Sequence, residues 1–198
     1  MKEMLSHKKS LDILKKTNAL LEGHFVLSSG LHSSKYIQCA KLLSFPTKSE
    51  KICRSLANKI KKEFKKIDLI LAPAVGGIVI GYEIGKILKK ETIFCERVKG
   101  KFTLRRGFNI KKKSKVLIIE DVITTGKSSM ECVKLINQAK ATAVGFASII
   151  DRSTKKSLKI KKKIVSHLKI DVPTFKANQL PNYLKKIPIT TPGSRFIK

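Results

Sequence analysis

Residues 115–129, KVLIIEDVITTGKSS, constrain the fold of this chain more than any other stretch. Four aliphatic residues stand in an unbroken row at 116–119, which is typical of a strand buried on both faces of a parallel sheet. The predicted strand spans 116–120, and Glu120 and Asp121 stand at its carboxyl end. A helical pattern of apolar residues begins at Met130. The stretch therefore predicts an α/β fold with a central, mostly parallel sheet flanked by helices.

The turn between this strand and its helix has the composition of a phosphate cradle. Small hydroxyl and glycine residues precede the helix, where backbone N–H groups and the helix dipole favour an anion. The letters TGKS also end the phosphate loop of nucleotide hydrolases, but Asp121 stands where that motif needs its first glycine. A carboxylate there would repel a phosphate held directly in the loop, whereas it suits sugar hydroxyls or a metal ion carrying a diphosphate. The alternative is an ordinary strand–turn–helix junction.

This stretch resembles the phosphoribosyl-diphosphate (PRPP) motif of the type I phosphoribosyltransferases. The resemblance implies that the acidic pair reaches the ribose hydroxyls, with Asp121 also catalytic, and that the turn holds the 5′-phosphate. It implies Mg²⁺ as cofactor, bound mainly through PRPP, with no direct protein ligand assigned. The PRPP-binding positions that it implies here are Glu120, Asp121, Val122, Ile123, Thr124, Thr125, Gly126, Lys127 and Ser128.

A second strand-to-helix loop follows the apolar strand predicted at 68–71. It contains Gly76 and Gly77, whose lack of a side chain lets the backbone approach a ligand closely, and a helix is predicted at 77–88. In the family this position is the diphosphate loop, so both glycines are expected to bind PRPP. Some orotate-specific members carry a lysine in place of Gly76. The alternative is that the glycines serve only helix–strand packing.

A basic segment follows the strand predicted at 92–96. Arginines and lysines crowd around two glycines there, and a flexible basic loop could fold over a departing diphosphate and later release it. The resemblance makes Arg97 a PRPP contact and makes Lys99 and Lys101 competing candidates for the catalytic lysine. The alternative is an exposed basic hairpin.

The N-terminal part predicts a helix at 5–22, ended by Gly23, and then a hairpin at 24–38. The hairpin resembles the hood of orotate phosphoribosyltransferases, whose pattern is F-x-L-x-S-G-x-x-S. This resemblance implies that Ser29 and Gly30 bind orotate. Many such enzymes carry a lysine in place of Ser28; His32 or Lys35 could replace that cation.

Arg152 follows a strand predicted at 143–150. Its planar guanidinium group can donate two parallel hydrogen bonds to a carboxylate or to the edge of a pyrimidine. The resemblance implies that Arg152 and Thr124 contact orotate, while the alternative is a surface ion pair with Asp151. The lysine-rich residues 155–163 read as solvated, and 164–170 read as an edge or hood strand. We expect one domain, 1–198, whose small hood is built from N- and C-terminal segments near 20–40 and 164–198.

A further helix is predicted at 47–64, with Thr47 and Glu50 as a capping box and Lys59 on its solvated face.

The net charge of +29 admits nucleic-acid binding. The lysines are scattered and not interleaved with aromatics, so a solvated basic surface is the simpler interpretation. The four cysteines form no C-x-x-C pair, the N-terminus has no secretory pattern, and residues 69–81 are too short to span a bilayer. These features favour a cytoplasmic protein with reduced thiols and no membrane segment.

Together these features predict transfer of ribose 5-phosphate from PRPP to orotate, a step of pyrimidine (UMP) biosynthesis. The resemblance also implies a homodimer in which the loop lysine reaches the neighbouring subunit. Two alternatives stay open at this point. One is a related transferase acting on a purine or uracil, and the other is a PRPP-sensing regulator that binds nucleic acid.

Overall fold

The computed structural model describes residues 4–27, 29–154, 158, 160–190 and 192. Its helices and strands, in chain order, are α1 (His7–Lys16), β1 (Leu20–Val26), β2 (His32–Ile37), α2 (Cys39–Leu43), α3 (Pro46–Glu63), β3 (Leu69–Pro73), α4 (Gly76–Leu88), β4 (Glu91–Val98), β5 (Lys101–Leu104), β6 (Lys115–Ile123), α5 (Lys127–Gln138), β7 (Thr142–Asp151), β8 (Ile164–Lys169), β9 (Thr174–Phe175), a 3₁₀ turn (Ala177–Gln179), α6 (Asn182–Lys185) and β10 (Ile189–Thr190).

The main sheet has six strands in the order β5-β4-β3-β6-β7-β8. All neighbouring strands are parallel except β4 and β5, which form an antiparallel hairpin at one edge. The aliphatic row of β6 lies at the centre of this sheet and is completely buried, because helices cover both faces. The predicted α/β class and mostly parallel sheet are therefore confirmed.

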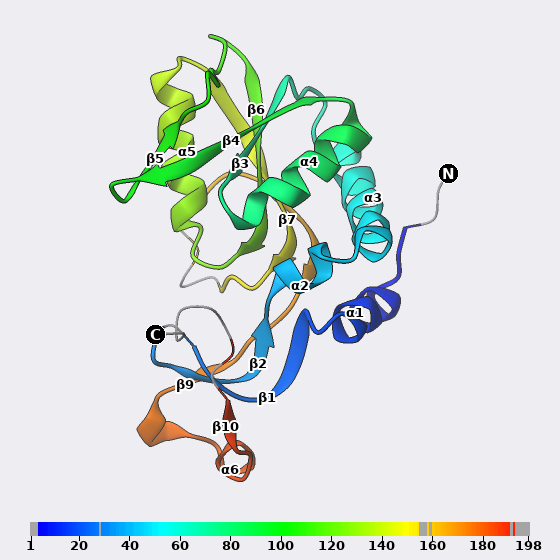
Figure 1. Cartoon of the computed structure of the whole chain (residues 1–198), viewed down its shortest axis with the longest axis vertical. Helices are drawn as coiled ribbons and strands as arrows, with labels where there is room; N and C mark the ends of the chain where they lie inside the picture. The colour runs from blue at the N-terminus through cyan, green and yellow to red at the C-terminus, as the bar shows by residue number, and fades with distance from the viewer. Residues whose placement is uncertain (1–3, 28, 155–157, 159, 191, 193–198) are drawn as a thin grey trace.

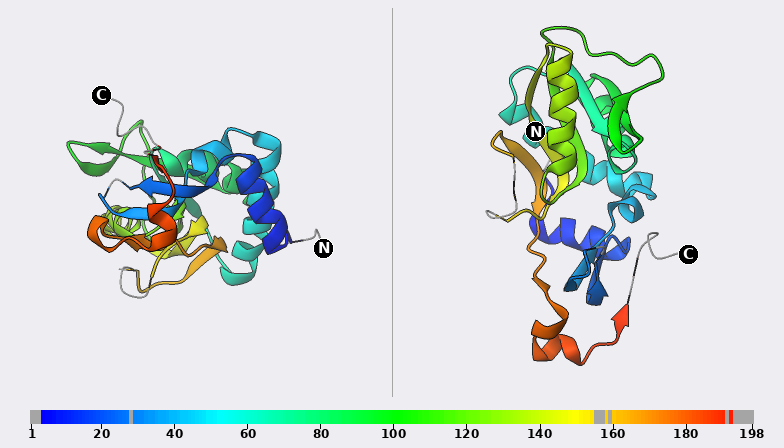
Figure 2. Two further views of the ribbon diagram at one scale, coloured as in Figure 1. Left: turned by 90° about the horizontal axis from the view of Figure 1, so that it is seen from below. Right: turned by 90° about the vertical axis from the view of Figure 1, so that its left-hand side faces the viewer.

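The helices divide between the two faces of the main sheet (Figures 1 and 2). Apolar residues of α3 and α4 fill a core on one face, together with residues of α1 and α2. Residues of α5 fill a second core on the opposite face, with Phe102 and Ile160. Each parallel strand thus buries one row of side chains on either face of the sheet.

A second, smaller sheet forms the hood, in the order β10-β1-β2-β9 (Figure 1). It joins the N-terminal hairpin β1–β2 to two short C-terminal strands. Residues 164–170 contribute the edge strand β8 of the main sheet, parallel to β7, so the C-terminal share of the hood begins with β9. Because β8 leads directly into the hood, the carboxyl ends of the parallel strands face it.

The predicted helix at 5–22 was wrong at its C-terminal end. The helix α1 stops at Lys16 because Asn18 adopts the left-handed conformation, with φ of 54°. Asn18 N–H donates to Lys15 O (3.0 Å) and Ala19 N–H to Leu14 O (2.9 Å), which is a Schellman motif. Gly23, predicted to end the helix, lies inside β1 instead.

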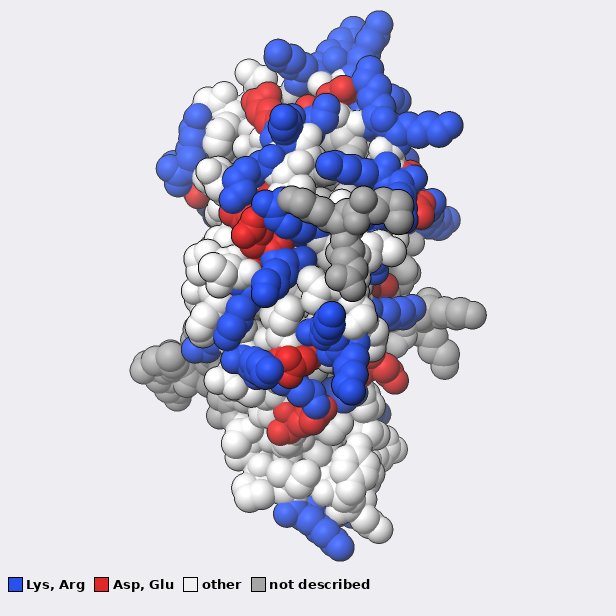
Figure 3. Space-filling view, turned by 90° about the vertical axis from the view of Figure 1, so that its right-hand side faces the viewer, with Lys and Arg blue, Asp and Glu red and all other residues white. Residues whose placement is uncertain are grey.

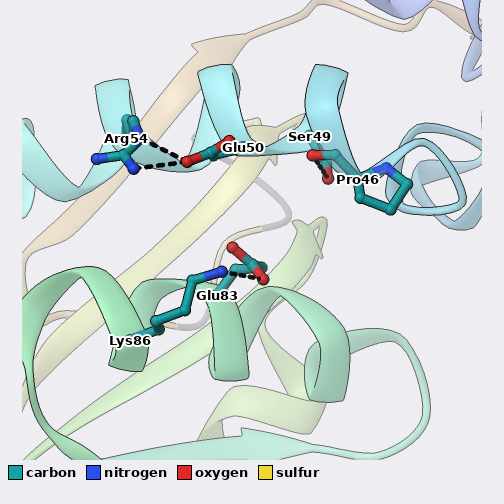
Figure 4. A network of polar contacts seen from close by, with 6 residues as sticks. All are labelled: Pro46, Ser49, Glu50, Arg54, Glu83 and Lys86. Carbon is teal, nitrogen blue, oxygen red and sulfur yellow. Dashed lines mark hydrogen bonds and ion pairs between the residues drawn. The ribbon is translucent and has the colours of Figure 1, made fainter.

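The predicted capping box at Thr47 was also wrong. The helix α3 begins at Pro46, whose fixed φ suits the first helical position, and Phe45 precedes it without a side-chain cap. Ser49 Oγ donates to Pro46 O (3.0 Å), and Glu50 is paired with Arg54 one turn further along (Figure 4). Pro46 and Ser49, and not a capping box at Thr47, therefore shape this helix end.

A buried polar network joins α1, α3 and β8. Ser10 Oγ donates to Ser6 O (2.8 Å) and accepts from His167 Nε2, also at 2.8 Å. Lys59 Nζ donates to the carbonyls of Ser166 (3.1 Å) and His167 (2.8 Å), so the prediction that Lys59 is simply solvated was wrong. Burial, helped by the charge of Lys59, lowers the pKa of His167 to about 4.

We expect this histidine to make the protein less stable as the pH falls from 6.5 towards 4. The unfolded chain binds a proton at His167 below pH 6.5, whereas the folded chain does not until about pH 4. Between pH 7.5 and 5, folding should lose about 2 kcal/mol through this group. Urea unfolding of the native chain and of His167→Gln, which keeps a donor towards Ser10 but does not titrate, measures the difference. Equal pH slopes for the two proteins would contradict the assignment.

Lysine and arginine side chains are distributed over the main domain, with carboxylates among them (Figure 3). Several are paired, including Lys16 with Asp12 and Arg54 with Glu50. In the described part of the chain no helix is both long and apolar enough to cross a membrane. The four cysteines are free and buried, as predicted for reduced thiols.

Candidate active site

The predicted phosphate cradle lies where β6 ends and α5 begins. Strand β6 runs to Ile123, three residues further than predicted, and α5 starts at Lys127. Gly126 stands between them with φ of 73°, a conformation that favours glycine. Thr125 Oγ1 accepts from Lys127 N (3.3 Å), which shapes the turn. The backbone of the turn and the first turn of α5 thus form a helix N-terminus suited to an anion.

Four of the predicted PRPP-binding positions, residues 120–123, have their backbones in β6 of the main sheet. Val122 pairs with Ile150 and Ile123 with Asp151 in the ladder between β6 and β7. The Ile123 side chain is buried in the core on the α5 face, so a ligand would have only its backbone to contact. Among the described residues the cradle proper is therefore 124–128.

Ile160 closes the back of the cradle. A Cβ added to Gly126 would stand 2.6 Å from Ile160 Cδ1, so only glycine fits against this side chain. The lysine-rich residues 155–163 were predicted to be solvated; Ile160 and Leu158 instead pack on the core, although 155–157 and 159 lie outside the described residues. The two apolar positions in that segment were the signal that could have revealed this contact.

Glu120 and Asp121 face opposite sides of the main sheet, because successive strand residues alternate. Glu120 is buried against α5, where its Oε1 accepts from Ser129 Oγ (2.8 Å). Burial raises the pKa of Glu120 to about 7; the Ser129 hydrogen bond opposes this shift, Asp121 adds to it and Arg97 also opposes it. Ser129, one position beyond the predicted set, was missed because a buried serine in a helix has no distinctive sequence signal.

Asp121 lies against the glycine loop that follows β3. Its Oδ1 accepts from Val122 N (2.9 Å), and burial raises the pKa of this carboxyl. A Cβ added to Gly76 would stand 2.8 Å from Asp121 Oδ2, so the carboxylate occupies the place where a side chain at position 76 would begin. This contact explains the absence of a lysine at Gly76 in physical terms.

The two glycines of this loop have different roles. Gly76 is exposed at the start of α4, next to a cis peptide bond between Ala74 and Val75. Gly77 is buried, and a Cβ there would stand 2.9 Å from Ile119 O. Helix–strand packing therefore accounts for Gly77, whereas Gly76 brings exposed backbone beside an acidic side chain.

The basic segment contains a hairpin, in which β5 pairs antiparallel with β4 at the edge of the main sheet. Strands β4 and β5 are joined at Lys99 and Gly100, whose φ values of 49° and 79° are typical of the two-residue turns that suit hairpins. Lys99 and Lys101 are exposed at the tip of the hairpin. The side chain of Arg97 is also exposed and contacts Glu131 of α5. Arg105 and Arg106 approach Glu96.

Arg152 lies at the carboxyl end of β7, beside the end of β6, and its backbone N–H donates to the backbone carbonyl of Ile123 (2.9 Å). Its Nε is buried and has no hydrogen-bond partner in the described part of the chain, and burial lowers the pKa of the guanidinium. No described ion pair joins it to Asp151, whose Oδ1 instead accepts from Ser153 N (2.8 Å). A buried donor without an acceptor is costly and is expected where a polar ligand binds.

The hood turn carries the predicted orotate contacts Ser29 and Gly30, both exposed. Ser28, where other enzymes have a lysine, lies outside the described residues. Of the two suggested replacement cations, Lys35 donates to Asp171 O (3.4 Å). His32 is buried in the hood, where its Nδ1 lies 2.7 Å from His24 Nε2.

Comparison with known proteins identifies this arrangement. Residues 46–185 match the phosphoribosyl transferase domain family. The orotate phosphoribosyltransferase of Parvibaculum lavamentivorans is 42% identical over 194 residues, which cover 98% of this chain and 100% of that one. The chain belongs to the orotate phosphoribosyltransferases.

Solved structures agree with the fold of an orotate phosphoribosyltransferase. The crystal structure of this enzyme from Aeropyrum pernix matches with a TM-score of 0.70 at 25% identity, covering 80% of this chain and 92% of that one. An adenine phosphoribosyltransferase from Thermoanaerobacter pseudethanolicus matches with a TM-score of 0.59 at 17% identity, covering 69% of this chain and 88% of that one. The second likeness shows a shared fold alone. The orotate prediction is thereby confirmed over the purine, uracil and regulator alternatives.

Proposed function

We propose that this orotate phosphoribosyltransferase uses the site described above to transfer ribose 5-phosphate from PRPP to N1 of orotate. The bond from ribose C1 to the diphosphate oxygen breaks, a bond from C1 to N1 forms, and N1 loses its proton. The products are orotidine 5′-monophosphate, diphosphate and the released proton. The observation that carries the assignment of residues is that the ends of β3, β6 and β7, neighbours in one sheet, bear Gly76, the cradle and Arg152. Ligands bind at this end of the strands in open α/β sheets.

Each part of PRPP has a partner in this proposal. The backbone of 124–128 binds the 5′-phosphate, and Asp121 with Glu120 orients the ribose and stabilises positive charge that develops at C1. The Gly76–Gly77 loop and Arg97 bind the diphosphate, with Lys99 or Lys101 neutralising it as it departs. Positioning carries much of the catalysis, since orotate is already acidic and needs no covalent nucleophile.

Orotate itself would lie between the cradle and the hood. The partnerless Nε of Arg152 supports contact with a carboxylate or carbonyl oxygen of the base. Thr124, at the start of the cradle, and the exposed turn residues Ser29 and Gly30 complete the proposed orotate site.

Mg²⁺ belongs to the proposal as a cofactor bound mainly through PRPP. In the described part of the chain no three His, Cys, Asp or Glu side chains gather as ligands for an ion. Mg²⁺ prefers oxygen ligands and commonly binds through substrate phosphates and one or two carboxylates, so the Asp121 rim fits it. When bound, it would neutralise charge on the diphosphate.

We also propose a cytoplasmic location, which the free, buried thiols support.

We further propose a homodimer. The apolar residues Val75, Val79 and Tyr82 recur at helical spacing next to the diphosphate loop and are exposed by 82%, 48% and 65%. An exposed apolar stripe of this kind supports a protein–protein interface. Strand alternation puts Lys101, opposite Val98, on the hairpin face away from Arg97 and Phe102, which supports action in the neighbouring subunit's site. Light scattering measures the oligomeric state.

The proposed reaction is tested by mixing the protein with orotate, PRPP and Mg²⁺ and following the loss of orotate absorbance. We expect turnover of orotate and none of hypoxanthine or uracil. If the protein consumed hypoxanthine or uracil but did not consume orotate, the proposal would be contradicted.

We expect Gly76→Ala to lower kcat/KM for PRPP by about 100-fold, because displacing a catalytic group by about 1 Å has this order of effect. The new Cβ would stand 2.8 Å from Asp121 Oδ2, closer than such atoms can approach, so the carboxylate must move. When Asp121 is already replaced by Asn, Gly76→Ala should lower kcat/KM for PRPP far less, because the carboxylate that the new Cβ would displace is then already absent. Steady-state kinetics of the four proteins measure this coupling, and independent effects would contradict it.

A further inference from the structure

The side chain of Arg97 is restrained on three sides. Its Nη1 donates to Gly100 O (2.6 Å) and to Glu131 Oε2 (2.8 Å), and its guanidinium carbon lies 4.1 Å from the centre of the Phe102 ring. In the described part of the chain, the N–H groups on Nε and Nη2 have no hydrogen-bond acceptor. One edge of the guanidinium is therefore engaged and the other is open.

The restraints come from three separate parts of the molecule. Phe102 pairs with Arg97 across the hairpin and is 8% exposed, anchored in the core on the α5 face. Glu131 belongs to α5, whose first turn forms the cradle. Gly100 O lies in the hairpin turn itself. The orientation of Arg97 is therefore set by the hairpin, the core and the cradle helix together.

Arg97 lies beside the loop that follows β3. It stands two residues beyond Cys95, which pairs with Pro73 and whose carbonyl accepts from Ala74 N (2.7 Å). Planar guanidinium donors bind phosphate oxygens in pairs, so an oriented edge beside this loop suits a diphosphate. An arginine free to rotate would lose side-chain entropy on binding, whereas a restrained one has already lost it.

We propose that Glu131 is a positioning residue, which with Gly100 O and the Phe102 ring holds the Arg97 guanidinium with its Nε–Nη2 edge directed to the diphosphate of PRPP. This inference rests on the proposed function and deepens it. An exposed Arg–Glu pair alone adds little to stability, so the role of this pair lies in orientation. Glu131 does not itself touch the substrate.

The test compares Glu131→Ala, which removes the acceptor, with Glu131→Gln, which keeps an oxygen near the same place. Glu50→Ala is the matched control, because it breaks an Arg–carboxylate pair on α3 (Figure 4), a helix that carries none of the proposed substrate contacts. We expect Glu131→Ala to raise KM for PRPP and the Kd for inorganic diphosphate about tenfold, as for one displaced charge-assisted contact. KM for orotate should stay unchanged and kcat should change less than the PRPP KM. Glu131→Gln should recover most of the loss, and Glu50→Ala should behave as the native chain.

Three results would overturn the proposal. These are native-like diphosphate binding by Glu131→Ala, tighter binding by it, or an equal loss in Glu131→Gln and Glu131→Ala. Tighter binding would mean that Glu131 competes with the diphosphate for Arg97. Calorimetric titration with inorganic diphosphate needs no turnover. A failure of the native chain to consume orotate would therefore count against the proposed function, while the titration still decides the role of Glu131.

Discussion

The double variant Asp121→Asn, Glu120→Gln is expected to lose turnover by on the order of 10³-fold while keeping its fold. Both amides preserve size and most hydrogen bonds, but they remove the negative charge that would stabilise the ribose as its C1 becomes positive. Asp121 should account for most of the loss, because it lies beside the Gly76 loop whereas Glu120 is tied to Ser129. Steady-state kinetics give the loss, and circular dichroism with a melting curve checks the fold.

The contribution of Glu120 should depend on pH. Because its pKa is raised to about 7, the native side chain is protonated at pH 6 and charged at pH 8. The single variant Glu120→Gln should therefore differ little from the native chain in kcat/KM at pH 6 and more at pH 8. Asp68→Asn is the control, since Asp68 accepts from Lys115 N (2.8 Å) at the opposite end of the sheet. If the double variant Asp121→Asn, Glu120→Gln turned over as fast as the native chain, the proposed role of the acidic pair would be wrong.

Removing the loop lysine should produce the second large effect. We expect Lys101→Ala or Lys99→Ala to lower kcat by about 100-fold or more with a much smaller change in PRPP binding, because the charge is needed as the diphosphate departs. Lys113→Ala serves as the control: it too is an exposed lysine with positive φ, but it precedes β6 at the other end of the sheet. If neither hairpin variant slows turnover, the assignment to this hairpin is wrong.

Mixing inactive variants would show which subunit the lysine serves. In a mixture of Lys101→Ala and Asp121→Asn chains, a lysine acting across the dimer leaves one intact site in each mixed dimer. Random exchange then restores about a quarter of native activity, since about half of the dimers are mixed. A lysine acting within its own subunit restores none.

The central predictions succeeded because they rested on local patterns. The aliphatic row of β6, the turn after it and the glycines at the start of α4 each specify their structure within a few residues. The errors came where a distant contact or an unrecognised cap prevailed. The N-terminal helix ended early at Asn18, and Leu20 paired with Ile37 in a strand. The basic segment formed a hairpin because its turn residues accept positive φ and its strand joins the sheet edge.

The sequence alone determined that a buried aliphatic strand leads into two carboxylates and a turn of hydroxyl and glycine residues, since these features lie within fifteen consecutive residues. Only the tertiary structure decided how this turn is surrounded. Asp121 lies against Gly76, Arg97 pairs with Glu131, and the Nε of Arg152 is buried without a hydrogen-bond partner among the described residues. Each of these facts depends on strand order and helix packing. The physical reason is that local backbone preferences act over a few residues, whereas contacts between segments far apart in the chain exist only after the sheet and both cores have formed.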